Sequence, residues 1–369
     1  MLIINQKGEI KCSSISEYDK KVIQLVEKWQ SQQEYFEIFT SGSTGQPKKI
    51  KLERNLIIES IKLTQKAFTL EPDDTLFCCL NAEYIAGMMM IFRALYLKTE
   101  ILIIEPSSYP FENESIRNFL TNKSIFYAFV PLQMQTLLES ENDLHLLNAA
   151  KAIIVGGAAV NQAITQKLQQ ISSPVYATYG MTETITHIAI QKLNGENQNG
   201  YFEALENVKL AVDENNCLKI NAPTTKNEWI VTNDVVEIAD SNKFKLIGRK
   251  DNIINSGGVK IQLEKVEAII EEILVKEQLS LKRFFCWGVA DEKLGQKLVI
   301  FAERNKTVLE SDILQKSLLF KQMQASSLLS KFEKPKDLIW LDKFKETSTA
   351  KIDKIKTVNE YIQHKIPNR

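Results

Sequence analysis

The sequence predicts an α/β protein in which a large α/β domain with a small β subdomain precedes a small α+β domain. Over residues 1–200, short apolar runs alternate with segments of helical spacing, as in a sheet that helices cover on both faces. Closely spaced alternating strands follow, and after about residue 250 helical and strand patterns mix again. A chain of 369 residues is long enough for two or three domains with real cores.

The first 70 residues predict a helix, a pair of strands and a second helix. Apolar residues at helical spacing over 15–33 lead into a strand at 35–39. The alternating residues 50–52 predict a partner strand, joined to the first by a tight turn. A helix over 54–68 should end before Glu71-Pro72-Asp73-Asp74, which has the composition of a turn.

Five further apolar runs have the length of buried strands, and helical segments such as 132–138 and 163–168 separate some of them. The five runs lie at 76–80, 100–104, 125–130, 152–155 and 175–177. Ligands of such sheets bind beyond the carboxyl ends of the strands. The loops after the last two runs are therefore candidate parts of a binding site.

The second half of the chain predicts a β subdomain at about 201–248 and a compact α+β domain. Strands are expected at 208–212, 218–220, 229–231, 235–238 and 244–247. The charged, glycine-containing segment 248–260 is the best boundary in the chain, which gives domains of 1–250 and 251–369. In the second domain, elements are expected at 263–273, 284–289, 297–302, 313–320 and 337–341, before a last helix.

Composition excludes several classes of partner. The 46 basic residues balance the 46 acidic ones, so no overall field draws the protein to nucleic acid or to an anionic membrane. The five cysteines are odd in number and have no paired spacing, which argues against a disulfide framework or a zinc site and for a cytoplasmic protein. Charged residues interrupt the apolar stretch 85–104, so no membrane span is expected.

The stretch Phe39-Thr40-Ser41-Gly42-Ser43-Thr44-Gly45-Gln46-Pro47-Lys48-Lys49 has the composition of a loop that binds phosphate. Glycines let backbone N–H groups approach an anion, hydroxyls add rotatable donors, and lysine supplies positive charge. The glycine and lysine spacing does not fit the Walker A pattern, so this is a different kind of loop. A flexible Ser/Gly linker is the alternative reading, and the residues by themselves leave both open.

Two other loops follow predicted strands and combine small with polar residues. Gly156-Gly157-Ala158-Ala159 is small enough for a flat ring to lie against its backbone. Tyr179-Gly180-Met181-Thr182-Glu183-Thr184 offers an aromatic ring, hydroxyls and a carboxylate. Either loop by itself has the composition of an ordinary turn. Both lie where the sheet would place a ligand.

Five motifs, in order, resemble those of the adenylate-forming acyl-CoA synthetases. They are Ser41-Gly42-Ser43-Thr44-Gly45-Gln46-Pro47-Lys48, Tyr179-Gly180-Met181-Thr182-Glu183, Thr232-Asn233-Asp234, Gly248-Arg249-Lys250-Asp251 and Thr347-Ser348-Thr349-Ala350-Lys351. The resemblance covers nearly the whole chain. It implies a two-step reaction: a carboxylic acid joins the α-phosphate of ATP with release of pyrophosphate, and the CoA thiol then displaces AMP.

The resemblance also implies ATP, Mg²⁺ and CoA as cofactors or co-substrates, and roles for individual residues. Because charge builds on phosphoryl oxygens, positioning and electrostatics should carry the catalysis. The residues implied to bind the nucleotide are Thr40, Ser41, Gly42, Ser43, Thr44, Gly45, Lys48, Gly157, Ala158, Tyr179, Gly180, Asp234 and Arg249. Asp234 has two carboxylate oxygens for the two ribose hydroxyls.

Three residues are implied to be catalytic. Thr182 would contact the α-phosphate, and Glu183 would ligate Mg²⁺, which favours carboxylate and phosphate oxygens. Lys351 would bridge the α-phosphate and the substrate carboxylate. Outside such motifs, Glu183 and Lys351 would be read as solvated surface groups.

The acyl substrate and a hinge complete the implied site. Residues expected near the acyl group are Tyr84, Gly87, His187, Ser256, Gly257 and Gly258. Asp251 matches the hinge about which the mobile C-terminal domain rotates between the two steps. A core position for Tyr84, a structural histidine at 187 and an ordinary linker at 251 are the alternatives.

A narrower resemblance is to the o-succinylbenzoate-CoA ligases of menaquinone biosynthesis, which implies o-succinylbenzoate as the acid. It rests on Tyr84-Ile85-Ala86-Gly87-Met88-Met89, Phe129-Val130-Pro131-Leu132-Gln133 and the segment 251–258. The phosphate loop comes early for this family, near residue 40, which indicates a shortened N-terminal region and leaves a homo-oligomer open. Ala350 and Asn233 replace glycines of the family motifs. Another aryl- or acyl-CoA ligase, a carrier-loading enzyme and an inactive nucleotide-binding sensor or scaffold stay as alternatives.

Overall fold

The computed structural model describes residues 1–12, 14–40, 48–279, 281, 283–304, 309–347 and 352–365. The chain divides into two compact units. The first holds Met1–Asp213, Leu218–Thr232 and Ile238–Lys245, and the second holds Glu214–Cys217, Asn233–Glu237 and Leu246–Arg369. The predicted α/β fold class is confirmed. The predicted hinge at Asp251 stays a prediction.

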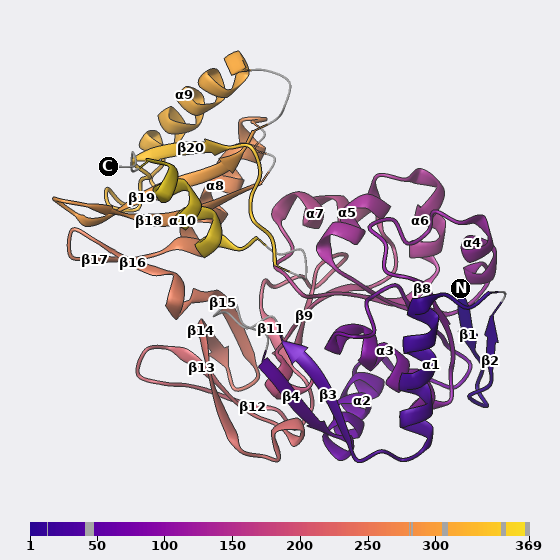
Figure 1. The fold of residues 1–369 in the computed structure, drawn as a ribbon. Helices are drawn as coiled ribbons and strands as arrows, with labels where there is room; N and C mark the ends of the chain where they lie inside the picture. Colours follow the sequence, from indigo (N-terminus) through magenta and orange to yellow (C-terminus); the bar gives the residue numbers. More distant parts are fainter. Residues whose placement is uncertain are drawn as a thin grey trace. The chain divides into compact units, whose positions relative to one another are not determined.

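The first unit is built on a parallel sheet. Its strands are β5 (Thr75–Cys78), β6 (Glu100–Ile103), β7 (Ile125–Phe129), β8 (Ala150–Val155) and β9 (Val175–Gly180). They lie in the order β6-β5-β7-β8-β9, and every neighbouring pair is parallel (Figure 1). Since β5 lies between the two later strands β6 and β7, the strand order reverses there. The carboxyl ends of β5 and β7 thus form a topological switch point, where sheets of this kind bind ligands.

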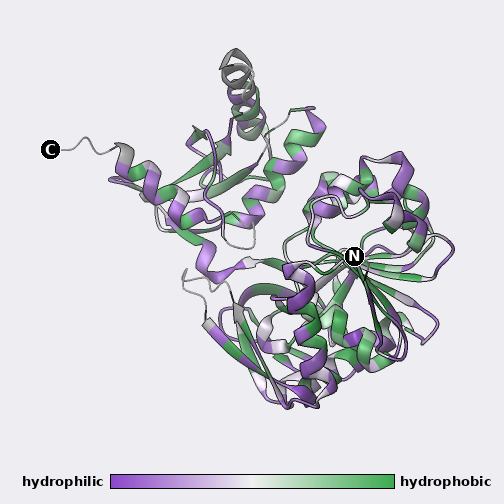
Figure 2. Ribbon diagram, turned by 45° about the vertical axis from the view of Figure 1, so that its right-hand side comes forward, coloured by the Kyte–Doolittle hydropathy of each residue, from purple (hydrophilic) through white to green (hydrophobic). Residues whose placement is uncertain are grey.

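Helices cover both faces of this sheet, because successive strand residues point to opposite sides. Leu76 and Cys78 belong to one buried cluster, while Phe77 and Cys79 belong to the other. The apolar strands are seen in Figure 2. The first cluster packs against α1 (Glu17–Gln30), α2 (Arg54–Phe68) and α3 (Ile85–Leu97). The second packs against α4 (Glu114–Leu120), α5 (Pro131–Leu138), α6 (Glu141–Asn148) and α7 (Gln162–Lys167).

Antiparallel strands extend the sheet at both edges. Beyond β9 the order continues through β10 (His187–Lys192), β11 (Phe202–Ala204), β15 (Lys243–Arg249), β14 (Trp229–Asp240), β13 (Cys217–Asn221) and β12 (Lys209–Val212). Beyond β6 lie β1 (Leu2–Ile4) and β2 (Ile10–Cys12). The prediction of separate strands at 229–231 and 235–238 is wrong, because β14 runs through both. Much of β14 is exposed, so the polar residues between these segments fit an uninterrupted strand.

The strand pair predicted around the phosphate loop forms a two-stranded sheet of its own. β3 (Tyr35–Thr40) and β4 (Lys48–Glu53) are antiparallel, and Thr40 pairs with Lys48. The ring of Phe36 in β3 packs against Trp29 and Phe92, which fixes the hairpin to α1 and α3. The predicted helices before and after the hairpin are confirmed as α1 and α2.

The second unit is a mixed sheet with helices on both faces. β16 (Ile253–Ser256), β17 (Val259–Gln262), β18 (Phe284–Asp291) and β19 (Gly295–Glu303) lie in the order β17-β16-β19-β18, and β20 (Asp337–Leu341) pairs with β19 in parallel. One buried cluster joins the sheet to α8 (Leu263–Lys276) and α9 (Leu309–Ala325). Another joins it to α10 (Lys354–Lys365).

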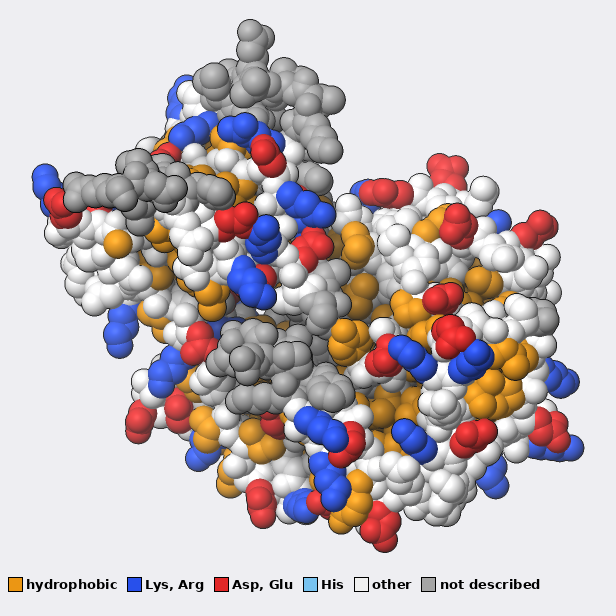
Figure 3. Space-filling model, in the orientation of Figure 1, with side chains coloured by type: hydrophobic (Ala, Val, Ile, Leu, Met, Phe, Trp, Pro, Cys, Tyr) orange, Lys and Arg blue, Asp and Glu red, His pale blue; other side chains and the backbone are white. Residues whose placement is uncertain are grey.

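The surface mixes charges of both signs. On the face shown in Figure 3, basic and acidic side chains are interspersed, in keeping with the equal totals of the sequence. Among the helices of the described ranges, none combines the length and the apolarity needed to cross a bilayer.

Candidate active site

The carboxyl ends of β5 and β7 are tied together by one buried side chain, Gln133. Its amide donates to Ser107 O at 2.8 Å and to Cys79 O at 3.3 Å. Its Oε1 accepts from the N–H of Val130 at 3.1 Å. The side chain therefore holds the loops at the switch point in place. The sequence singled out Gln133 only as part of a motif, because a buried glutamine has no distinctive pattern.

The loop after β8 offers small, exposed residues at the same edge. The N–H of Gly156 donates to Phe129 O at 3.0 Å, and a Cβ on Gly156 would lie 2.4 Å from Thr178 Oγ1. Gly157 has a φ of +86°, which favours glycine. Gly157 and Ala158 are exposed. These features fit a flat ring lying against the loop, and contact with adenine stays a prediction.

Tyr179 near the end of β9 packs inside the first unit. Its ring is 8% exposed and lies 5.0 Å from the ring of Phe244 and 5.7 Å from that of Phe202, between centroids. These contacts are tight aromatic packing at the end of a strand. A role at adenine stays a prediction for this residue.

Glycine is required at position 180 because the backbone of residues 186 and 187 passes very close to it. A Cβ at this position would lie 2.2 Å from Thr186 O and 2.5 Å from the Cα of His187, both backbone atoms. No side chain fits there without moving the backbone where β9 meets β10. The glycine of this motif therefore has a structural reason, whatever it contributes to nucleotide binding.

Thr182 and Glu183 follow directly, in a short 3₁₀ turn, η2 (Thr182–Thr184). Glu183 is exposed and Thr182 is partly exposed. Within the described residues, neither side chain makes a hydrogen bond or an ion pair. The Thr182 hydroxyl and the Glu183 carboxylate are therefore available to a ligand. Both residues follow the carboxyl end of β9 (Figure 1).

The donor chemistry of this segment fits Mg²⁺ better than a more demanding metal. The described residues hold no group of three or more His, Cys, Asp or Glu placed to bind a metal ion. Mg²⁺ needs no such group, because it keeps several waters and takes phosphate oxygens as ligands beside one or two carboxylates. Glu183 suits that kind of site.

The segment ends in a strained turn at Ile185. Its φ of 65° and ψ of −63° are those of the rare γ-turn, and the N–H of Thr186 donates to Thr184 O at 2.8 Å. A positive φ is unusual for a β-branched residue, and such strain costs about 1–3 kcal/mol. No sequence pattern indicated this turn, since isoleucine is among the residues least expected at a positive φ.

A buried polar network lies behind this turn. Thr186 Oγ1 is 2.7 Å from Ser60 Oγ of α2 and accepts from Arg93 Nη2 of α3 at 3.3 Å. One residue on, His187 Nε2 lies 3.2 Å from Thr64 Oγ1. Ser60 and Thr64 are four residues apart and so share one face of α2.

The network contains a buried cation. Arg93 is 2% exposed, and its Nε has no hydrogen-bond partner. In the described ranges no carboxylate pairs with it, and burial lowers the pKa of Arg93 to about 10. Burial, together with Arg93, lowers the pKa of His187 to about 3, so this histidine is neutral at physiological pH. The structure thus favours the structural role for His187 over contact with the acyl group.

Tyr84 and Gly87 begin α3 and have different environments. Tyr84 is partly exposed at the N-cap, which leaves its ring available as a wall of a pocket. Gly87 is buried, and a Cβ there would lie 2.4 Å from Asn81 O. Close packing therefore accounts for Gly87. Contact of either residue with the acyl group stays a prediction.

In the second unit, Arg249 joins two predicted site residues. Its Nη1 lies 3.1 Å from Asp234 Oδ1, and its Nη2 lies 3.2 Å from Asp251 Oδ2. Asn233 Nδ2 also donates to Asp251 Oδ2, at 3.3 Å. Asn233, which replaces a glycine of the family motif, thus donates a hydrogen bond to the predicted hinge residue. A carboxylate held beside a guanidinium keeps acceptor capacity for hydroxyl donors such as those of ribose.

Ser256, Gly257 and Gly258 form the turn of the β16–β17 hairpin. Ser256 is 1% exposed and pairs with Val259. Gly257 and Gly258 have φ values of 59° and 83°, the signs that a two-residue hairpin turn of type I′ requires. Hairpin geometry explains both glycines. Their predicted place near the acyl group is untested.

The remaining predicted residues lie at or beyond the limits of the described chain. Ser41, Gly42, Ser43, Thr44, Gly45 and Lys351 are outside the described residues. Thr40 and Lys48 are the paired ends of β3 and β4. On either side of Lys351, Glu346 and Ile352 form an antiparallel bridge.

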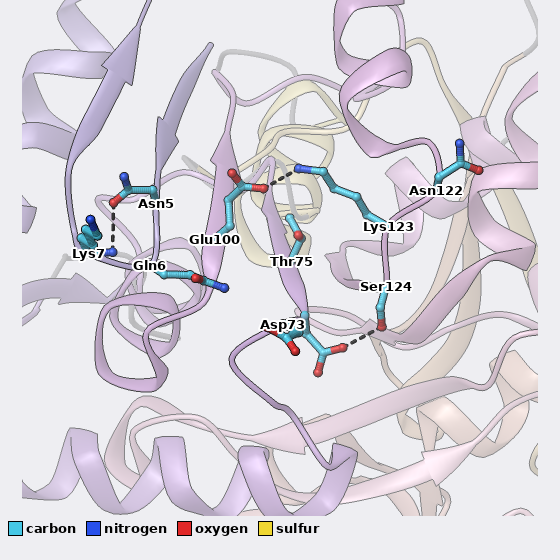
Figure 4. Close-up of a pocket in the computed structure, with 10 residues that line it drawn as sticks. Asn5, Gln6, Lys7, Asp73, Thr75, Glu100, Asn122, Lys123 and Ser124 are labelled. Carbon is cyan, nitrogen blue, oxygen red and sulfur yellow. Dashed lines mark hydrogen bonds and ion pairs between the residues drawn. The ribbon is translucent and has the colours of Figure 1, made fainter.

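A separate cavity of about 470 Å³ lies at the opposite edge of the sheet (Figure 4). Its lining includes Thr75 and Glu100, which begin β5 and β6. Two of its acidic groups are already paired: Glu100 with Lys123, and Asp74 with Lys151 at 2.7 Å. Because ligands of parallel sheets bind at the carboxyl ends, this cavity is not the candidate active site.

Comparison with known proteins decides the family. Residues 3–225, more than half of the chain, match the family described as AMP-binding enzyme. The chain belongs to the AMP-binding enzyme family. The resemblance to adenylate-forming enzymes is thereby confirmed.

Two solved structures are similar to the chain in fold. An acyl-CoA synthetase (AMP-forming)/AMP-acid ligase II-like protein from Dyadobacter fermentans is 34% identical, with a TM-score of 0.62 over 98% of this chain and 99% of that one. An o-succinylbenzoate coenzyme A synthetase from Bacillus subtilis, solved with ATP and magnesium ion, is 17% identical, with a TM-score of 0.70 over 87% of this chain and 69% of that one. At that identity the second likeness shows the fold alone.

Curated relatives of the chain include 2-succinylbenzoate–CoA ligases. The ligase from Listeria monocytogenes is 23% identical over 94% of this chain and 74% of its own length. The ligase from Lactococcus lactis is 21% identical over 85% of this chain and 68% of its own length.

Proposed function

We propose that the protein is an AMP-forming acid–CoA ligase that converts o-succinylbenzoate to o-succinylbenzoyl-CoA, with ATP, Mg²⁺ and CoA. The observation that carries the proposal is the pair Thr182 and Glu183. In this chain of the AMP-binding enzyme family, the two side chains follow the carboxyl end of β9 and have no hydrogen-bond or ion-pair partner among the described residues. The choice of acid rests on the 2-succinylbenzoate–CoA ligases, which align with most of the chain.

In the first step this chain binds and orients the reactants. Thr182 contacts the α-phosphate, and Glu183 holds Mg²⁺, which when bound offsets the charge on the phosphate oxygens. The phosphate loop over residues 40–48 grips the outer phosphates. Lys351 neutralises charge where the substrate carboxylate meets the α-phosphate.

Adenine and ribose are recognised by different groups of the chain. Gly157 and Ala158 provide a surface without bulky side chains for adenine. Asp234 accepts the ribose hydroxyls through its carboxylate, which Arg249 Nη1 orients from 3.1 Å. These contacts bind the nucleotide before and after adenylation, so they should affect KM more than kcat.

The second step needs the acyl-adenylate to meet the thiol of CoA. We assign to Asp251 a rotation of the C-terminal domain that removes Lys351 and admits the thiol. The acid, ATP and CoA are small soluble metabolites, which suits an enzyme of the cytoplasm. Tyr84, partly exposed at the start of α3, forms a wall of the acyl pocket.

The test is pyrophosphate release across a panel of acids: o-succinylbenzoate, benzoate, a medium-chain fatty acid and malonate. We expect release with o-succinylbenzoate and thioester only when CoA is present. Release with another acid but not with o-succinylbenzoate contradicts the choice of acid. Transfer to a carrier protein but not to CoA favours a carrier-loading enzyme, and no release with any acid favours a nucleotide-binding sensor.

Lys351→Ala separates the two steps. We expect adenylation to fall by roughly a hundredfold or more, because a transition-state contact is lost. Thioester formation from preformed acyl-adenylate should be largely kept. Lys343→Ala, an exposed lysine nearby in the sequence, is the control. Equal adenylation rates in wild type and Lys351→Ala remove Lys351 from the mechanism.

A further inference from the structure

The backbone turn at Ile185 is strained, so surrounding contacts must stabilise its conformation. Ile185 is 3% exposed, and its backbone adopts a φ of 65° without being a glycine. Such conformations persist only where surrounding contacts over-determine them. The turn follows the short segment Thr182–Thr184, which contains the two residues proposed to bind the nucleotide and Mg²⁺.

The contacts that hold the turn come from buried side chains of two helices, α2 and α3. Ser60 Oγ lies 2.7 Å from Thr186 Oγ1, and Arg93 Nη2 donates to the same oxygen at 3.3 Å. Ser60 and Arg93 are 1% and 2% exposed. Thr186 is therefore anchored by its side chain to the core of the first unit, immediately after the strained residue.

Hydrogen bonds inside the loop connect Thr186 to the residues proposed to bind the nucleotide and Mg²⁺. Thr184 Oγ1 lies 2.8 Å from Thr186 O and 3.0 Å from the N–H of Met181. The N–H of Ile185 donates to Thr182 O at 3.0 Å. A shift of Thr186 would therefore be transmitted to the whole segment from 181 to 184.

The hydroxyl of Thr186 is not needed for packing alone. Replacing paired buried polar groups by apolar groups of the same shape can be nearly neutral for stability. A buried guanidinium without a carboxylate partner in the described chain is, by contrast, a costly way to fill a core. The contacts of Thr186 with Ser60 and Arg93 are better explained if they fix the backbone geometry of the turn at Ile185.

We propose that Thr186 is a positioning residue for adenylation: through Ser60 and Arg93, its hydroxyl holds Ile185 in the γ-turn and so fixes the places of Thr182 and Glu183. The inference rests on the proposed function, because it takes these two residues to bind ATP and Mg²⁺. Thr186 itself touches neither ligand. Its effect on the reaction is through the backbone.

The experiment compares Thr186→Val, Thr186→Ser, Ser60→Ala and the double variant Ser60→Ala/Thr186→Val. Thr186→Val keeps the branched shape and loses the hydroxyl, whereas Thr186→Ser keeps the hydroxyl. We expect kcat for pyrophosphate release to fall about 10- to 100-fold in Thr186→Val, as misplacement of reacting groups by about 1 Å can cause. Thr186→Ser should stay within about threefold of wild type.

The double variant tests whether Ser60 acts through Thr186. If it does, Ser60→Ala/Thr186→Val should be no slower than Thr186→Val alone, because the two residues form one contact. Independent losses that multiply contradict this part of the inference. A crystal structure of Thr186→Val should show Ile185 released from its positive φ.

Ser173→Ala is the matched control for stability. Ser173 is 6% exposed, and its Oγ lies 2.8 Å from both Asn148 O and Ala150 O, near the amino end of β9. It should lower the melting temperature and keep kcat. A Thr186→Val enzyme that loses stability like Ser173→Ala but keeps kcat overturns the inference.

Failure of the proposed function would be distinct, because the wild type would then release no pyrophosphate with any acid. In that case, the inference is tested by titration calorimetry, which measures the affinity of the same variants for Mg²⁺ and ATP. We expect binding about tenfold weaker in Thr186→Val than in Thr186→Ser. Equal affinities overturn the inference.

Discussion

Glu183 is an exposed carboxylate that makes no ion pair within the described residues, and its proposed partner is Mg²⁺. We predict that Glu183→Gln lowers the rate of pyrophosphate release by roughly a hundredfold, since it removes the charged ligand that draws the metal to the phosphates. The variant should also need more Mg²⁺ to reach half of its maximal rate. Rates measured over a Mg²⁺ titration check this.

Glu196→Gln is the control, because Glu196 is equally exposed but lies beyond β10. It should behave as wild type over the whole titration. If Glu183→Gln also follows the wild-type curve, Glu183 does not bind the metal.

Because His187 is buried, we predict that the free energy of unfolding depends on pH. Its pKa is about 3 when buried in the folded protein and about 6.5 in the unfolded chain. Between these values the unfolded chain binds more protons, so the free energy of unfolding falls as pH falls below about 6.5, by up to about 1.4 kcal/mol per pH unit. Above that range His187 adds no pH dependence.

Urea unfolding at pH 7, 6, 5 and 4 measures this contribution. We expect His187→Gln to show a shallower loss of stability between pH 6 and pH 4 than wild type. His145→Gln, which changes an exposed histidine of α6, should keep the wild-type slope. An unchanged slope in His187→Gln contradicts the buried, neutral state of this histidine.

At the scale of elements, the junction of β9 and β10 depends on Gly180. We predict that Gly180→Ala destabilises the protein by about 1–3 kcal/mol, because its Cβ would lie 2.2 Å from Thr186 O, a backbone atom. Gly156→Ala is a fair comparison, since its Cβ would meet a side-chain oxygen, Thr178 Oγ1, which can rotate away. Denaturant unfolding should show the larger loss for Gly180→Ala.

Periodic elements were predictable from the sequence, whereas their partners were not. α2 has the predicted bounds 54–68, and all five strands of the parallel sheet were anticipated. Hydrophobic periodicity specifies an element's type but not which strand pairs with which. The sequence thus did not reveal that β3 and β4 stand apart from the main sheet.

The site was predictable only where motif residues act through their own chemistry. The motif indicated Thr182 and Glu183, which the structure leaves free of protein partners in the described chain. Thr186 and Ser60, which hold that segment, come from elements far apart in the sequence. Arg93 looked only like a charge that interrupts an apolar stretch, because its contact with Thr186 depends on how α3 packs.

At the scale of the whole molecule, the protein has two units, and its proposed second step needs a rotation near Asp251. We predict that Asp251→Pro slows thioester formation about tenfold or more while adenylation is largely kept, because a fixed φ restricts the hinge. Single-turnover assays of each step check this. Asp240→Pro, a change near the exposed end of β14, is the control for a new proline. If both steps of Asp251→Pro run at wild-type rates, the hinge lies elsewhere.

The proposed reaction couples cleavage of ATP to AMP with formation of one thioester. The most direct measurement is mass spectrometry of the products that the wild-type protein makes from o-succinylbenzoate, ATP, Mg²⁺ and CoA. We expect o-succinylbenzoyl-CoA and AMP in equal amounts, each absent without enzyme. ADP in place of AMP, or no thioester above the enzyme-free control, would contradict it.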